Sequence, residues 1–95
     1  MVEQLRKQVI DIQGKVKDHM DKPGDPAARQ LNTQIQALED ELQVGKKAGS
    51  LVGRVDRIID ILKGDAKRAR IMNYEHLEMF VKWFEHLRET LKRLS

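Results

Sequence analysis

The chain has no cysteine, few prolines and glycines, and only four aromatic residues. Without cysteine there is no disulfide framework, no thiolate metal site and no cysteine nucleophile. Two prolines and six glycines among 95 residues disfavour a loop-rich fold. No apolar run approaches the roughly 18 residues that a membrane span needs, and the first twenty residues alternate charged and apolar groups, unlike a signal peptide. We therefore expect a cytoplasmic protein built from helices.

Charge and helical apolar spacing dominate the sequence instead. Charged residues make up 35% of the chain and hydrophobic residues 40%, which favours long helices with one solvated face over a disordered chain. Charges balance within residues 1–48, so the net charge of +3 comes entirely from residues 49–95. At this length we expect a single domain spanning residues 1–95, with a modest core and no room for a deep catalytic cleft.

Apolar residues spaced three and four apart predict two matching helices in the first half of the chain, over 2–20 and 26–44. The apolar residues form one line, or seam, along each helix. The first seam contains Val2, Leu5, Val9, Ile12 and Val16, and the second contains Ala28, Leu31, Ile35, Leu38 and Leu42. Between them, Pro23 disfavours a helix, while Asp25 followed by Pro26 is typical of an N-cap and a first helical residue. Two such seams joined by a short turn predict an antiparallel hairpin with coiled-coil-like packing.

The segment after the hairpin permits two interpretations. Gly45, Gly49 and Gly53 allow either a loop or a bent, continuous helix. The apolar residues after this segment do not continue the three-and-four spacing of the second helix, which favours a break between two helices. In the loop interpretation the second helix ends at Gly45, and Ser50 caps a third helix over 50–63.

One long helix is predicted at the end of the chain. Gly64 is a natural residue to end the third helix. The last helix is expected over 66–94, or from near residue 73 if Asp65 caps a separate turn and Asn73 caps the long helix. No sustained period-two alternation predicts a strand. The predicted fold class is all-α and four-helix bundle-like, with an N-terminal antiparallel hairpin followed by two further helices.

All four aromatic residues belong to the last predicted helix, where the apolar surface is unusually wide. At 100° per residue, one stripe contains Tyr74, Leu77, Phe80, Val81, Phe84, Leu87 and Leu91, and Met72, Met79 and Trp83 lie beside it. The combined arc covers roughly half of the circumference, more than one core contact requires. We therefore predict that a partner protein contacts the side of the arc formed by Met72, His76, Met79 and Trp83. The other interpretation of His76 is a boundary histidine with one nitrogen in water.

Residues able to support catalysis are present but are not arranged for it. His19, His76 and His86 are scattered, without the spacing of metal ligands. Ser50 has the place of a helix cap and Ser95 is terminal, so neither hydroxyl is placed beside a base. We expect no enzymatic activity, no metal and no cofactor.

The predicted function is a protein–protein interaction module. Methionine adapts to irregular partner surfaces, and tryptophan is enriched at binding hot spots. We expect self-association, most simply as a homodimer, or a role as a small subunit or adaptor of a larger assembly. Neither a membrane nor a small-molecule substrate is an expected target.

Positive charge in or near the predicted connections supports an alternative function. The residues concerned are Lys46, Lys47, Lys63, Lys67, Arg68 and Arg70. Such clusters either contact phosphate or simply solvate the surface. The stretches AGSLVGR (48–54) and FVKWFE (80–85) resemble segments of the small helical subunits of CRISPR effector complexes. This resemblance implies contact with a nucleic-acid backbone through basic side chains.

Overall fold

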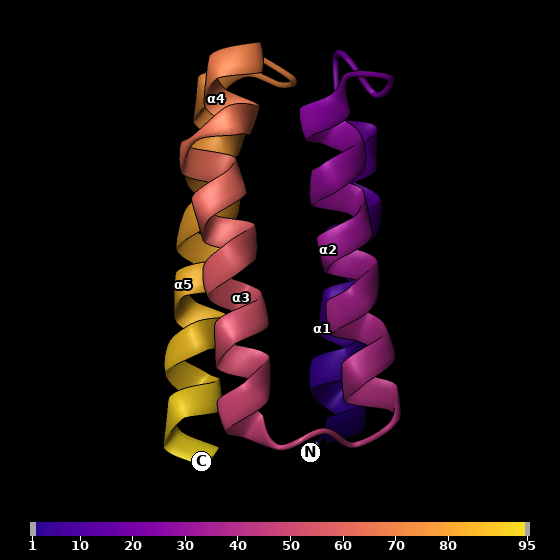
Figure 1. The fold of residues 1–95 in the computed structure, drawn as a ribbon, viewed down its shortest axis with the longest axis vertical. Helices are drawn as coiled ribbons and strands as arrows, with labels where there is room; N and C mark the ends of the chain where they lie inside the picture. The colour runs from indigo at the N-terminus through magenta and orange to yellow at the C-terminus, as the bar shows by residue number, and fades with distance from the viewer. Residues whose placement is uncertain (1, 95) are drawn as a thin grey trace.

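The computed structural model describes residues 2–94, with the side chain of Val2 excepted. Its helices are α1 (Val2–Asp18), α2 (Pro26–Gln43), α3 (Ala48–Lys63), α4 (Asp65–Ala69) and α5 (Tyr74–Leu94). The four long helices run antiparallel, side by side, in a bundle 34 Å long and 18 Å across (Figure 1). The prediction of an all-α, four-helix bundle-like fold is confirmed. The predicted seam position at Val2 and the terminal Ser95 lie outside the described side chains.

The four long helices do not approach one another equally. In Figure 1, α2 and α3 lie in front, with α1 behind α2 and α5 behind α3. Close backbone contact is most extensive between α3 and α5, and it is also extensive along the α1–α2 and α2–α3 seams. The α1–α5 seam has far fewer close approaches, so it is the loosest seam of the bundle.

The turn of the N-terminal hairpin forms as its sequence predicts. Pro26 is the first residue of α2, and the side-chain oxygen of Asp25 accepts a hydrogen bond from the Ala27 amide at 2.9 Å. This bond satisfies one of the free N–H groups at the start of the helix. The preceding turn also packs against the other half of the chain. The amides of Asp21 and Lys22 both donate to the Ile71 carbonyl, at 2.7 and 3.3 Å.

The predicted break between the second and third helices is confirmed. Gly45 has φ +74°, a left-handed conformation that costs glycine little and ends α2 after Val44. The prediction that Ser50 caps the next helix is wrong. α3 begins two residues earlier, at Ala48, after Lys47, which makes no side-chain cap bond. Lys46 and the extended Lys47 separate the glycine turn from Ala48, so Ser50 lies inside the first turn of α3.

The second half contains a short helix before the long one. α4 ends at Ala69, and the next residue, Arg70, adopts the left-handed conformation with φ 53°. A continuous helix over 66–94 is therefore wrong, and the interpretation with a start near residue 73 is correct. The carbonyl of Asn73 accepts the Leu77 amide at 3.0 Å, as expected of the residue that precedes α5. Asp65 is the first residue of α4 rather than its cap.

The core follows the predicted apolar seams. Leu31, Ile35 and Leu38 of α2 and Phe80 and Phe84 of α5 are fully buried. Burial of each such side chain stabilises the fold by roughly 1.5–3 kcal/mol. Tyr74 was expected in the same stripe, but it is 54% exposed. It stands at the first position of α5, where the core ends, and the Lys67 amino group lies 5.2 Å from the centre of its ring.

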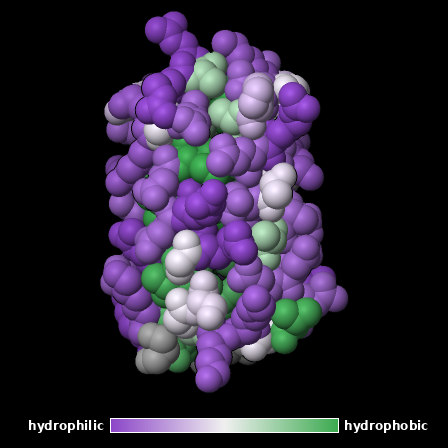
Figure 2. All heavy atoms as spheres, viewed as in Figure 1, coloured by the Kyte–Doolittle hydropathy of each residue, from purple (hydrophilic) through white to green (hydrophobic). Residues whose placement is uncertain are grey.

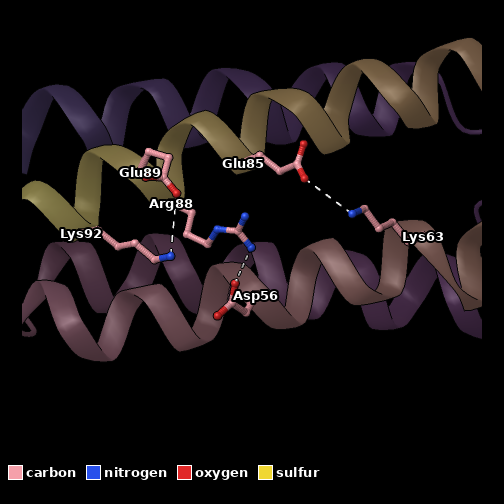
Figure 3. A network of polar contacts seen from close by, with 6 residues as sticks. All are labelled: Asp56, Lys63, Glu85, Arg88, Glu89 and Lys92. Carbon is pink, nitrogen blue, oxygen red and sulfur yellow. Dashed lines mark hydrogen bonds and ion pairs between the residues drawn. The ribbon is translucent and has the colours of Figure 1, made fainter.

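Polar contacts join the helices around this core. Arg54 of α3 bonds to Glu41 of α2 through two nitrogens, at 2.7 and 2.8 Å. Between α3 and α5, Arg88 contacts Asp56 at 2.9 Å (Figure 3). The face with α2 and α3 in front is largely hydrophilic, with hydrophobic atoms visible along the seam between them (Figure 2). This face therefore offers little apolar contact surface.

Candidate protein-interaction groove

A groove runs along the loosest seam, between α1 and α5. We name it the α1–α5 groove, and its lining residues are Gln8, Asp11, Ile12, Lys15, Met79, Lys82 and Trp83. Two of the four predicted partner-binding residues, Met79 and Trp83, thus lie together in it. The opposite wall comes from α1, and no local pattern in the sequence connects α1 with these residues of α5.

The α5 wall of the groove is apolar. Met79 and Trp83 are four residues apart, so they lie on the same side of the helix. Met79 is 47% exposed, while Trp83 is half-buried and packs against the core. The Trp83 ring contacts the ring of Phe84 edge to face, with centroids 5.1 Å apart. Because Phe84 is fully buried, this contact holds the indole in place while part of it remains accessible to a partner.

The α1 wall has an apolar floor and a polar rim. Ile12 is buried at the base of the wall. Gln8, Asp11 and Lys15 are exposed above it, and Lys15 pairs with Asp11 at 3.2 Å along the helix. A partner that fits the groove therefore presents apolar side chains to Ile12, Met79 and Trp83, and polar groups to the α1 rim.

The other two predicted partner-binding residues lie elsewhere. Met72 is only 3% exposed, so the prediction that it forms part of a partner surface is wrong. It precedes the start of α5, so the helical projection that placed it beside Met79 does not apply to it. His76 is half-buried, and its ring contacts that of His19 at the end of α1. Nothing in the sequence pairs these two histidines, so this contact could not be predicted from it.

The basic residues of the alternative function do not form one surface. Lys46 and Lys47 lie in the α2–α3 connection, at the opposite end of the bundle from the segment 63–70 (Figure 1). Within that segment, Lys63 pairs with Glu85 of α5 at 3.5 Å (Figure 3). Much of the positive charge is therefore separated or neutralised by neighbouring groups.

The remaining cations at that end differ in their surroundings. Arg68 pairs with Asp65, and Lys67 lies over the ring of Tyr74. No ion pair is seen for Lys67 or Arg70 among the residues that the structure describes. The tyrosine is itself perturbed, because a hydrogen bond to Glu78 and the negative charge of that carboxylate raise the pKa of Tyr74.

The charged side chains in the groove are those of Asp11, Lys15 and Lys82. Its seven lining residues include no serine, cysteine or histidine, so it contains neither a hydroxyl or thiol nucleophile nor an imidazole base. Comparisons with protein-family models, with curated proteins and with solved structures found no match. Over residues 2–94, no helix combines the length and the apolar character required to cross a bilayer.

Proposed function

We propose that this protein is a non-enzymatic, helical protein–protein interaction module that binds through the α1–α5 groove. A second copy of the chain is the partner we expect first, because closed pairs of identical subunits are the commonest oligomers. A role as a small subunit or adaptor would use the same surface. The observation that supports the proposal is the placement of exposed Met79 and half-buried Trp83 in an open groove at the loosest seam.

The physical properties of these two residues suit a binding surface. The Trp83 ring is already held by its contact with Phe84, so binding has little side-chain freedom left to remove there. The flexible thioether of Met79 adapts to the shape of a partner. The exposed polar rim of α1 resembles the wet edge that surrounds the apolar centre of an interface.

The oligomeric state tests the proposal. We expect the wild-type protein to self-associate in sedimentation equilibrium, and Met79→Glu to weaken that association at least tenfold. The reason is that an interface has to desolvate the new carboxylate without a compensating partner. Because nearly half of Met79 is exposed and the residue is not part of the buried core, the far-ultraviolet helical signal should persist. Trp83→Glu should weaken association similarly, although it also removes the contact with Phe84.

A matched control is available at the end of the bundle. Val44 is 73% exposed at the end of α2 and lies outside the groove. Val44→Glu therefore adds the same charge as Met79→Glu without changing the groove. This variant should associate like the wild type. Because Trp83 is the only tryptophan, its fluorescence should change with protein concentration in the wild type and in Val44→Glu. A wild type that stays monomeric at every concentration, or a loss of association in Val44→Glu as well, would contradict self-association through the groove.

A further inference from the structure

Two histidines from opposite ends of the sequence meet at one end of the α1–α5 seam. His19 follows the last residue of α1, and His76 lies in the first turn of α5. Their ring centroids are 4.1 Å apart, with the ring planes at 64°. Both residues are half-buried, so the pair is held by the fold and still accessible to solvent. The ring of Phe80 lies 5.9 Å from that of His19 and flanks it on one side.

The hydrogen bond of His19 determines which of its nitrogens is free. Nδ1 lies 2.7 Å from the carbonyl oxygen of Lys15. A carbonyl only accepts hydrogen bonds, so Nδ1 carries the proton, and Nε2 of the neutral ring holds an open lone pair. Histidines that bind metals usually make this bond with their second nitrogen, because it fixes the tautomer and orients the ring.

We propose that His19 and His76 form a binding site for a divalent transition-metal ion. Imidazole nitrogens suit zinc, nickel and copper, whereas magnesium prefers oxygen ligands. The two rings are in contact, so the fold brings both imidazoles to one point at the end of the α1–α5 seam, and the bond of Nδ1 to Lys15 leaves Nε2 of His19 as its ligand atom. The described residues contain no group of three or more histidines and carboxylates that could hold a metal. The site therefore has two protein ligands, and water completes the coordination.

A bound ion at this site would connect the two helices that touch least. The His19–His76 pair joins the end of α1 to the start of α5, across the loosest seam of the bundle. An ion that binds the folded protein and not the unfolded chain stabilises the fold by mass action. The melting temperature is therefore a direct readout of the site, and it does not depend on the proposed protein partner.

Thermal unfolding of the tag-free protein with and without metal salts tests the site. With zinc, nickel or copper chloride in excess, we expect the melting temperature to rise by about 4 °C or more. Magnesium chloride should leave it unchanged. His86 is an exposed histidine further along α5, so His86→Ala is the matched control and should respond to metal like the wild type.

Two substitutions should abolish the response. His19→Ala and His76→Ala each remove one ligand, and either should eliminate the metal-dependent rise. If a variant is too unstable to melt cooperatively, nickel titration calorimetry of the wild type and His86→Ala decides, with one ion bound per chain as the expected result. The proposal is overturned if the wild type shows no rise and no binding, if both variants retain the response, or if His86→Ala loses it.

Discussion

Individual residues of α5 have different surroundings although they belong to one apolar arc. Phe84 is buried in the core, Trp83 beside it is half-buried, and Met79, one turn before Trp83, is 47% exposed. Tyr74 begins the helix and lies in solvent beside Lys67 and Glu78. The helical projection orders these side chains around the axis. It does not say how far a neighbouring helix covers each of them.

The ionisation of Tyr74 is a prediction at the scale of single residues. Glu78 raises the pKa of Tyr74, so Glu78→Gln should lower that pKa towards the ordinary value of about 10. Folding favours the protonated phenol. The stability that the protonated Tyr74 contributes is therefore complete below the pH at which an unfolded tyrosine titrates. That stability is lost as the pH rises through the folded-state pKa of Tyr74.

Ultraviolet absorbance of the tyrosinate reports this titration without ambiguity, because Tyr74 is the only tyrosine. Glu75→Gln removes the adjacent carboxylate from another side of the same helical turn and is the control. Equal shifts in both variants would mean that general negative charge, rather than the bond to Glu78, raises the pKa.

Helix ends show where local sequence was sufficient to predict structure. α2 begins where Asp25 and Pro26 predict, because cap and proline chemistry acts within one turn. α3 begins at Ala48 without a side-chain cap, although Ser50 stands two residues later as an apparently better candidate. The extended Lys47 takes the N-cap position, so Ser50 falls within the helix and cannot cap it.

The N-cap of α2 leads to a prediction at the scale of the element. Asp25→Ala removes the acceptor of the Ala27 amide and should lower the free energy of unfolding by about 1 kcal/mol. Chemical denaturation followed by far-ultraviolet circular dichroism measures this change. Asp18→Ala makes the same exchange at an exposed site at the end of α1, where it should cause little or no loss. Equal losses in the two variants would refute the capping role.

The whole molecule separates charges that the sequence places within one basic half. Lys46 and Lys47 lie at one end of the bundle, and Lys67 and Arg70 lie at the other (Figure 1). Ion pairs occupy Lys63 and Arg68. A nucleic-acid backbone that contacts one end therefore meets far fewer cations than the sequence suggests.

The salt dependence of DNA binding tests the nucleic-acid alternative. If only Lys67 and Arg70 contact phosphate, duplex affinity should fall by only about tenfold between 50 and 200 mM salt, because each contact releases about one counterion. Fluorescence anisotropy of a labelled duplex measures this affinity. The double variant Lys46→Glu with Lys47→Glu should bind the duplex nearly as tightly as the wild type. A loss of about a thousandfold would indicate some six phosphate contacts and would favour the nucleic-acid function over the groove.

Local sequence patterns specify the helices, the hairpin turn and most of the core. Apolar spacing, caps and glycine turns act over a few residues, so Leu31, Asp25 and Gly45 have the roles that their local patterns predict. The sequence also predicts that Met79 and Trp83 lie side by side on one helix, because the apolar arc of α5 is itself a local pattern.

The residues that face the apolar arc of α5 are set by how the distant helices pack. Burial of Met72, exposure of Tyr74 and the α1 wall of the groove all depend on where distant helices end and how closely they pack. The contact of His19 with His76 depends on the bundle returning α5 to the side of α1. Residues so far apart in the chain are brought together by the burial of the whole core, which no local pattern specifies.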